Sequence, residues 1–348
     1  MAEVALEWCF PAGQVGGASA SEEKVLIASH HDAHFRAGLD DTGAVATEMA
    51  MAKAMIDSGY APKHTIIFMI TTAEEFGYTN CWFDWSIGAW YAITHTHPEW
   101  AGEIRGFLNL EAMARKGAKL TMRTSAEMAP WLTTSARGSA AWLPYGYNVS
   151  YPAHTWNDEW TFTAAGVPSV TFGATGDDYD FIYHTNLETK ELVDWTYVAG
   201  VGKFVGKLQR GLDRGIVPYS LKKRADDLAQ SITPGALMGA GADGATVLKL
   251  NTAAQSFRLA ANRYQARRAM IPAGHVAAVN AKIVTIEKEL LASFTALDAW
   301  DYTAYPHRCS GTHSSSTRPS PLSRRRSPSR RRRSRRSRTW APCGTACR

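Results

Sequence analysis

The sequence predicts an α/β fold: a mixed, mostly parallel central sheet flanked by helices, followed by a C-terminal helical domain and a disordered basic tail. Apolar runs of strand length alternate with helical segments as far as about residue 215. Helical periodicity alone then continues to residue 307, and the remaining residues are rich in Arg, Ser and Pro. We therefore divide the chain into residues 1–23, 24–215, 216–307 and 308–348.

Four apolar runs have the length and composition of buried strands. They are Lys24–Ser29, His64–Ile70, Ile104–Leu110 and Val167–Phe172. Polar residues with metal-binding or catalytic side chains follow each run along the chain. Because ligands of open α/β sheets bind outside the carboxyl ends of the strands, we expect these polar residues to gather at one edge of the sheet.

Helices connect and follow these strands. Thr42–Ser58 is rich in Ala and Met and lacks Pro, and Leu187–Gln209 has the pattern of a helix that packs back on the sheet. Beyond residue 216, apolar residues between Val279 and Leu297 recur at intervals of four and three and predict one helical face. Gln230–Ala245 contains Pro234 and four Gly, which predicts a loop.

The net charge of +6 arises from the tail alone. Residues 308–348 hold 13 Arg and no acidic residue, so the body keeps 38 − 13 = 25 basic residues against 32 acidic ones, a net charge of −7. A mildly acidic body lacks the basic surface of a nucleic-acid-binding protein. We therefore expect no nucleic-acid partner for the body of the chain.

Cysteine content and hydropathy exclude further classes. Only Cys9 and Cys81 lie outside the tail, so neither a disulfide framework nor a zinc ribbon is expected. No apolar run approaches the 18 residues of a membrane span. Met1–Gly17 lacks a basic start and a continuous apolar stretch and does not resemble a signal peptide. A cytoplasmic location is the default expectation.

The tail from Arg308 has almost no aliphatic residue beyond Leu322, so we expect it to be disordered. A solvated charged tail and an RNA-binding Arg-Ser segment are two interpretations of it. A third is that it is read out of frame, because it contains Arg without Lys and three Cys, and begins abruptly after His307. On this hypothesis, the helical domain would continue in another frame.

Five short polar motifs occur in the order and spacing of a two-zinc site. Zinc takes imidazole and carboxylate ligands, and in catalytic sites keeps a position open for water. Each motif follows an apolar run or lies in a loop after one. The five are His30-His31-Asp32, Asp40-Asp41, Glu74-Glu75, Glu111 and Tyr183-His184.

The first two motifs supply candidate ligands and their supports. His30 is the candidate ligand, with Asp32 as acceptor of its other ring N–H; His31 and His34 are rival ligands. Asp40 is expected to bridge both metals through its two oxygens. The alternative for the second motif is helix capping, because Asp is a good N-cap, and we assign that role to its second residue, Asp41.

The remaining motifs complete the site. In Glu74-Glu75 one carboxylate can bind metal while the other faces the bound water and takes its proton; two solvated Glu are the alternative. Glu111 and His184 are expected as terminal ligands, one on each zinc. Tyr183 is expected to place its hydroxyl where an oxyanion forms, and a packed aromatic side chain is its alternative.

These motifs resemble the M28 metallopeptidase family, the aminopeptidase and glutamate-carboxypeptidase group, over about residues 24–211. The matching segments are H-H-D-(x)7-D-D-T-G, A-E-E-F-G, N-L-E and Y-H-T. The fold that this resemblance implies is that of a zinc exopeptidase. Residues 280–307 are similar, more faintly, to the dimerisation domain of the glutamate carboxypeptidase branch, which implies a homodimer through the C-terminal helices.

The resemblance also implies a division of roles. One zinc takes His30, Asp40 and Glu111, and the other takes Asp40, Glu75 and His184. It further implies that Glu74 is the general base. Asn157, which begins an N-D pair, falls at a substrate-binding position of the family.

Two features depart from the family pattern. The family commonly has Asp at the position of Glu111, whose side chain is one methylene longer. Family members usually have leading strands before the position of Lys24, and the region before Lys24 is short by comparison. We therefore expect residues 1–23 to be a shortened form of the family's N-terminal region.

The sequence therefore predicts a di-zinc exopeptidase acting on peptides, with an aminopeptidase as the first hypothesis. A carboxypeptidase or dipeptidase of the same family is the alternative, because these motifs build the metal centre and not the specificity pocket. A receptor-like module without catalysis is a third hypothesis, which the retained ligands and Glu74 disfavour. Aromatic residues between Tyr78 and Trp100, among them Trp82, Phe83 and Trp85, would line a subsite or belong to the core.

Overall fold

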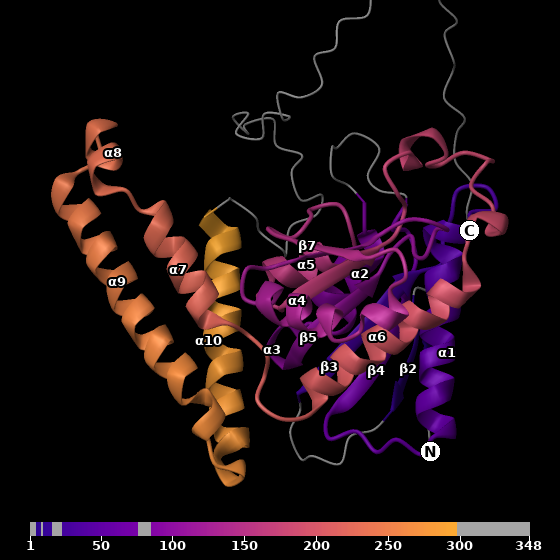
Figure 1. Ribbon diagram of the computed structural model, residues 1–348, viewed down its shortest axis with the longest axis horizontal. Coiled ribbons are helices and arrows are strands. Elements are labelled where there is room, and N and C mark those ends of the chain that lie inside the picture. The colour runs from indigo at the N-terminus through magenta and orange to yellow at the C-terminus, as the bar shows by residue number, and fades with distance from the viewer. Residues whose placement is uncertain (1–4, 8–9, 16–22, 76–84, 298–348) are drawn as a thin grey trace, which may run out of the picture. The chain divides into compact units, whose positions relative to one another are not determined.

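The computed structural model describes residues 5–7, 10–15, 23–75 and 85–297 (Figure 1). The predictions for the tail, residues 308–348, lie outside this range, as do those for Trp82 and Phe83. The described elements belong to one compact unit that joins the central sheet to the C-terminal helices.

A single sheet of eight strands forms the centre of the described residues, in the order β1-β2-β4-β3-β5-β8-β6-β7. Strands β4, β3, β5 and β8 are parallel neighbours, and β6 pairs in parallel with β7. The pairs β1–β2, β2–β4 and β6–β8 are antiparallel. The mixed, mostly parallel sheet that the sequence predicts is therefore confirmed. The strands are β1 (Ala5–Glu7), β2 (Phe10–Val15), β3 (Lys24–His30), β4 (Thr65–Thr71), β5 (Ile104–Leu110), β6 (Leu120–Thr124), β7 (Tyr147–Ser150) and β8 (Ser169–Gly173).

The four predicted strands are the four central ones, and each begins and ends within two residues of its predicted limits. Their burial explains this agreement. All seven residues of β5 are buried, and in β3 only Lys24 is not. Strands covered on both faces appear as continuous apolar runs, which are easy to recognise in a sequence. The outer strands β1, β2, β6 and β7 lack this signal and were not predicted.

Helices cover both faces of the sheet (Figure 1). Along β3, Val25 and Ile27 belong to the apolar cluster that includes residues of α1 and α6, whereas Leu26 and Ala28 belong to the cluster on the other face. This alternation is the two-residue period of a strand. The helices before the C-terminal region are α1 (Ala44–Asp57), α2 (Ile87–Tyr91), α3 (Trp100–Glu103), α4 (Ala129–Arg137), α5 (Glu159–Ala164) and α6 (Trp195–Asp213).

Helix α6 begins later than the sequence predicts. The carboxylate of Asp194 accepts hydrogen bonds from the backbone N–H groups of Thr196 and Tyr197 and so caps the helix at this point. The preceding residues form loop and a short helical turn rather than the first turns of the predicted helix from Leu187. Such short turns are η1 (Gly38–Gly43), η2 (Ala92–Thr96), η3 (Ala140–Trp142), η4 (Tyr179–Phe181), η5 (Lys190–Leu192), η6 (Arg268–Met270) and η7 (Ala273–His275).

The C-terminal helices are α7 (Leu221–Ser231), α8 (Pro234–Gly239), α9 (Gly244–Arg267) and α10 (Val276–Leu297). The predicted loop over Gln230–Ala245 is wrong in part, because α8 lies within it. Pro234 occupies the first turn of α8, where its missing N–H costs no hydrogen bond. Helix α10 is fixed to the sheet unit: the Thr295 hydroxyl donates to the carbonyl of Ala164 in α5 at 3.1 Å. Dimerisation through these helices stays a prediction.

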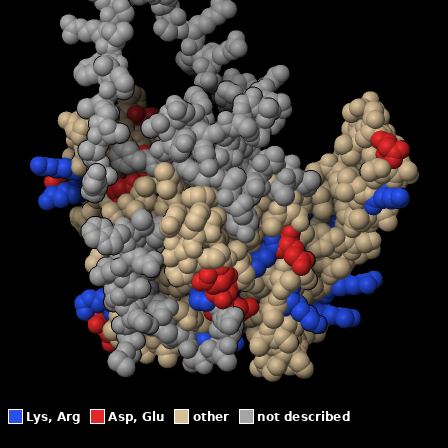
Figure 2. All heavy atoms as spheres, turned by 180° about the vertical axis from the view of Figure 1, so that it is seen from behind, with Lys and Arg blue, Asp and Glu red and all other residues tan. Residues whose placement is uncertain are grey.

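Charged side chains are mixed on the described surface. On the face shown in Figure 2, Lys and Arg lie among Asp and Glu, and no continuous basic area is seen over the described residues. No helix in the described part of the chain combines the length and the hydropathy of a membrane span.

Two glycines of α6 provide a test of the packing. A Cβ at Gly200 would lie 2.2 Å from the carbonyl oxygen of Trp142, whereas a Cβ at Gly206 would meet nothing within 4 Å. We expect Gly206→Ala to raise the free energy of unfolding by about 0.5–1 kcal/mol, through lower chain entropy in the unfolded state. Gly200→Ala should lower it by about 1–3 kcal/mol through overpacking. Urea unfolding of both variants measures this, and equal stabilities would contradict the packing of η3 on α6.

Candidate metal centre

The predicted site residues gather at the carboxyl edge of the central strands. His30 is the last residue of β3, and Glu111 follows β5 directly. Glu74 and Glu75 follow β4 after a two-residue connection, and His184 lies on the segment after β8. Because β4, β3, β5 and β8 are parallel neighbours, these loops all emerge on the same side.

Asp40 is brought to the same edge by the turn η1. This turn passes close to η5, and only Gly fits at position 38. A Cβ there would clash with the backbone of η5, because it would lie 2.4 Å from the Cα of Lys190. The backbone N–H of Asp40 donates to the carboxylate of Glu188 at 2.9 Å. The Asp40 side chain is thereby held between elements that are far apart in the sequence.

The first cluster contains His30, Asp40 and Glu111. The His30 Nε2 atom lies 3.2 Å from Oδ1 of Asp40 and 3.3 Å from Oε1 of Glu111. The other ring nitrogen, Nδ1, lies 2.9 Å from the carbonyl oxygen of Asp32, which accepts a hydrogen bond from it, so Nε2 faces the two carboxylates. One donor atom from each of the three residues lies within 4.8 Å of the other two.

The second cluster contains Glu75, His184 and His34. The His184 Nε2 atom lies 2.7 Å from Oε2 of Glu75 and 3.8 Å from Oδ2 of Asp40. His34 Nε2 lies 3.6 Å from the same Glu75 oxygen. The two oxygens of Asp40 therefore face different clusters, Oδ1 toward His30 and Oδ2 toward His184. The structure brings all five predicted ligands together; their roles as ligands stay predictions.

Two aspartates beside the clusters bind backbone N–H groups. The His30 Nδ1 atom lies 2.9 Å from the backbone carbonyl oxygen of Asp32 and 3.6 Å from its Oδ1 atom, so the predicted support of His30 by Asp32 stays a prediction. The Asp32 carboxylate also accepts from the backbone N–H groups of Glu74 and Glu75, at 3.3 and 3.0 Å. Asp41 was expected to cap the helix, which is wrong, because Gly43 is the N-cap of α1. The fully buried Asp41 carboxylate accepts from the backbone N–H groups of His30 and Ala112 and ties β3 to the end of β5.

Sequence analysis missed two residues that hold Asp40. The Tyr179 hydroxyl lies 3.1 Å from Oδ2 of Asp40 and 3.0 Å from Oε1 of Glu188. Glu188 is buried and follows His184 by four residues. An acidic residue just after the Y-H-T motif is the sequence feature that could have indicated it. Tyr179 lies within an acidic segment, where it was not distinguished from a surface aromatic residue.

Burial and mutual repulsion shift the protonation of the site. Burial raises the pKa of Glu111 to about 7, although the neighbouring His30 favours its charged form. Burial and the charge of Glu111 raise the pKa of Glu74 well above its usual range. Burial lowers the pKa of His30, but the charges of Glu111 and Asp41 outweigh this and raise it well above its ordinary value. The carboxyl groups of the site thus resist ionisation together, and a cation among them would favour their charged forms.

The chemistry of the donor set suits divalent cations. Glu75 Oε1 is buried and has no hydrogen-bond partner among the described residues. Asp40 Oδ1 and His184 Nε2 are buried beside the His30 imidazole and the Glu75 carboxylate. Buried polar atoms are nearly always paired, so the unpaired Glu75 oxygen marks a position for a cation. Imidazole nitrogens combined with carboxylate oxygens are the ligands that zinc takes in peptidase sites.

Strained backbone is concentrated around the site. Among the described residues, six that are not Gly have a positive φ, and four of these are site residues or their immediate neighbours. These four are Phe35 beside His34, Ala73 beside Glu74, Ala112 beside Glu111, and His184 itself. Such conformations cost on the order of 1–3 kcal/mol each and persist where the surrounding structure fixes them.

A cavity of about 380 Å³ opens beside the clusters. Asp40, Glu74 and Glu111 form part of its wall, and the predicted residues Asn157 and Tyr183 also line it. The ring of Tyr183 stacks on that of His184 with centroids 3.6 Å apart. Trp85, one of the aromatic residues considered for a subsite, lines the same cavity.

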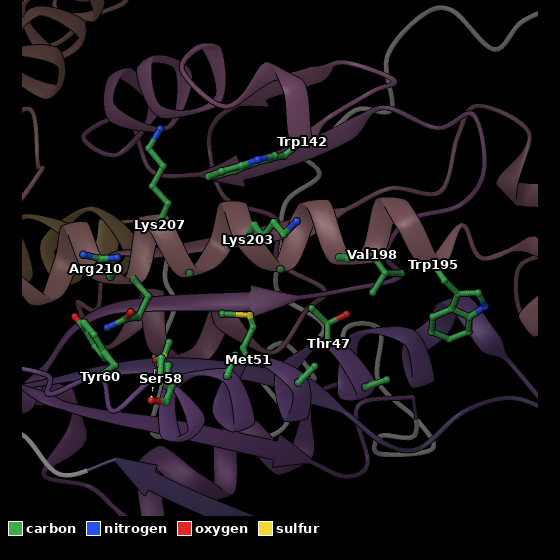
Figure 3. Close-up of a pocket in the computed structure, with 18 residues that line it drawn as sticks. Thr47, Met51, Ser58, Tyr60, Trp142, Trp195, Val198, Lys203, Lys207 and Arg210 are labelled. Carbon is green, nitrogen blue, oxygen red and sulfur yellow. Dashed lines mark hydrogen bonds between the residues drawn. The ribbon is translucent and has the colours of Figure 1, made fainter.

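A larger cavity of about 750 Å³ lies between α1 and α6, away from these clusters (Figure 3). Small residues of both helices, with Tyr60, Trp142 and Trp195, line it. None of the candidate ligands is among its lining residues. We therefore place the candidate site at the smaller cavity, whose wall includes Asp40, Glu74 and Glu111.

The geometry defines a metallopeptidase-type site on an α/β sheet. The chain belongs to Peptidase family M28, whose model matches residues 12–208. The predicted class, a hydrolase of the metallopeptidase type, is thereby confirmed.

Two metallopeptidases from other organisms are similar to part of the chain. Endoplasmic reticulum metallopeptidase 1 of Mus musculus is 29% identical over 226 residues, 61% of this chain and 22% of that protein. The Rattus norvegicus protein is 30% identical over 222 residues, 60% of this chain and 21% of that protein. The chain thus spans about a fifth of the length of these relatives.

Two solved structures are similar at low identity. The aminopeptidase from Aneurinibacillus sp. strain AM-1 has 21% identity and a TM-score of 0.47, covering 59% of this chain and 48% of that one. Porphyromonas gingivalis glutaminyl cyclase has 15% identity and a TM-score of 0.48, covering 60% and 82%.

Metal binding should release protons. The neighbouring carboxylates raise the pKa of His30 above its ordinary value, and burial raises the pKa of Glu111 to about 7. A ligand must be deprotonated to bind, so we expect zinc binding to release protons. Zinc affinity should accordingly fall as the pH drops below 7. Calorimetry in buffers of different ionisation enthalpy measures the release. His31→Gln, a change at an exposed neighbour, is the control, and a binding enthalpy independent of buffer would contradict the prediction.

Proposed function

We propose that this chain is a di-zinc aminopeptidase in which Glu74 is the general base. The observation that supports this most directly is the position of Asp40, whose two carboxylate oxygens face two separate groups of donors. A carboxylate placed in this way serves two metal ions at once. On this proposal His30, Asp40 and Glu111 hold one ion, and Asp40, Glu75 and His184 hold the other.

The extra methylene of Glu111 is compatible with this role. Its Oε1 atom reaches to 3.3 Å from the His30 Nε2 atom, and its Oε2 atom accepts from the amide of Asn109 at 3.4 Å. The backbone N–H of Glu111 donates to Phe172 at 2.8 Å and fixes the residue at the end of β5. Glu therefore fills the position at which the family commonly has Asp.

Zinc, when bound, would lower the pKa of a coordinated water to about 7 and polarise the scissile carbonyl. The residues of the chain supply the proton transfers. The Glu74 carboxylate is buried, its Oε2 atom lies 4.0 Å from the His30 Nε2 atom, and its Oε1 atom lies 3.5 Å from the Ser86 hydroxyl. From this position, Glu74 would accept a proton and deliver it to the leaving amine.

Residues of the cavity wall would hold the substrate. The Tyr183 hydroxyl is proposed to donate to the developing oxyanion, and stacking on His184 keeps its ring next to the metal site. Asn157, which lines the same cavity, would bind the substrate backbone. Asp180 also lines the wall, and its carboxylate, which has no role at the proposed metal ions, favours a substrate with a free α-ammonium group.

Arg123 supports the second candidate function, a carboxypeptidase or dipeptidase. It also lines the cavity and is the one cation with a fixed charge on the described wall. A guanidinium is well suited to bind the terminal carboxylate of a peptide. Asp180 is the wall carboxylate that the proposed metal ligands and Glu74 leave free for an α-ammonium group, and for this reason the aminopeptidase is the first proposal.

A substrate panel separates the two functions. We expect the zinc-loaded chain to hydrolyse aminoacyl amides with a free amine and to leave N-blocked dipeptides intact, because a blocked amine cannot pair with the Asp180 carboxylate. Release of the C-terminal residue from N-blocked dipeptides would instead identify a carboxypeptidase. Arg123→Ala should then abolish that activity, whereas it should leave aminopeptidase turnover within a few fold.

The two neighbouring glutamates should differ on substitution. Glu74→Gln is expected to keep both metals and to slow turnover by about two to four orders of magnitude, because an amide cannot accept the proton. Glu75→Gln should instead weaken metal binding. Metal content after dialysis and steady-state rates, measured on both variants, distinguish them, and a near wild-type rate for Glu74→Gln would exclude it as the base.

A further inference from the structure

We infer that His34 is a sixth metal ligand, which binds the second ion together with Glu75 and His184. This inference rests on the proposed two-metal function and adds a residue that neither the motifs nor the family's ligand pattern supplies. Sequence analysis considered His34 only as a rival of His30. The structure instead places the two imidazoles at different clusters.

The geometry of the second cluster carries the inference. The His34 Nε2 atom lies 3.6 Å from Oε2 of Glu75, and the His184 Nε2 atom lies 2.7 Å from the same oxygen. The two imidazole rings are 4.0 Å apart between centroids and tilted by 31°. One donor atom from each of the three residues falls within 4.8 Å of the others, the same criterion that the first cluster meets.

The local backbone directs His34 toward this cluster. The carbonyl of His34 accepts a hydrogen bond from the backbone N–H of Ala37 at 3.2 Å, which closes a tight turn. Phe35, inside the turn, has a φ of 57° although its side chain is 70% exposed. Packing of Phe35 therefore does not account for this conformation. The turn places His34 partly buried against Glu75 and His184, while the nearby His31 remains exposed.

A ligand at this position would make the two ions unequal. With the shared Asp40, the second ion would have four protein donors, from His34, Asp40, Glu75 and His184. The first would have three, from His30, Asp40 and Glu111. Zinc is usually four-coordinate, so the second ion would be closed by protein and the first would keep the open position that catalysis requires.

The two nearby histidines provide a matched test on the full chain. We expect His34→Ala to leave the first zinc ion at wild-type affinity and to weaken the second by at least about 10–100-fold, the cost reported even for partners that only support a ligand. His31→Ala should bind both ions as the wild type does. Competition against a chromophoric zinc chelator measures the two affinities. Two unchanged affinities in His34→Ala would overturn the inference.

Cobalt substitution distinguishes a ligand from a residue that only positions Glu75. Loss of an imidazole donor should change the visible absorption of the second cobalt ion in His34→Ala and equally in His34→Gln, whose amide can still hydrogen-bond to Glu75. Recovery of wild-type affinity and absorption in His34→Gln would show a positioning role and overturn the ligand assignment. A wild-type chain that binds fewer than two ions would instead overturn the two-metal proposal itself.

Discussion

The carboxylate of Asp40 is the group on which the arrangement of the site depends. Its two oxygens face His30 on one side and His184 on the other, so both clusters need it in one orientation. A buried carboxylate is costly unless it is paired. The Tyr179 hydroxyl and the Glu188 carboxylate, which accepts from the Asp40 backbone, hold the residue in place. Cations between the clusters would offset the charge that remains.

The sheet holds these ionisable groups together because the buried strands that carry them have fixed positions. Strands β3 and β5 are buried along almost their whole length and deliver His30 and Glu111 to the same edge. The Asp41 carboxylate joins β3 to the end of β5, because it accepts from the backbone N–H of His30 in β3 and from that of Ala112 just after β5. The candidate site thus lies at the carboxyl ends of the strands and in the strained loops that follow them, the usual position for a site on an α/β sheet.

Much of this could be predicted from the sequence, and the reason is physical. Buried parallel strands are continuous apolar runs, so β3, β4, β5 and β8 and the residues directly after them were recognisable. The edge strands, and α8 within its Gly-rich segment, depend on tertiary contacts and gave no clear local pattern. Side-chain partners were least predictable. The roles of Asp32 and Asp41 depended on which backbone N–H groups the fold brought near them.

The supporting residues were missed for a related reason. Tyr179 and Glu188 act on Asp40, which precedes Tyr179 by 139 residues, and no spacing in the sequence expresses that distance. His34 lies only two residues from Asp32 and was recognised as a possible ligand. The sequence offered no reason to place it against Glu75 rather than beside His30. Ligand types can be recognised from local motifs, whereas their division between two ions follows from the fold.

The most direct test of this account is anomalous diffraction from crystals of the zinc-loaded chain, recorded on both sides of the zinc absorption edge. The account predicts two zinc peaks of similar height, one on each side of the Asp40 carboxylate. A single peak, or two peaks that share no Asp40 oxygen, would contradict the claim that this carboxylate organises a two-metal site.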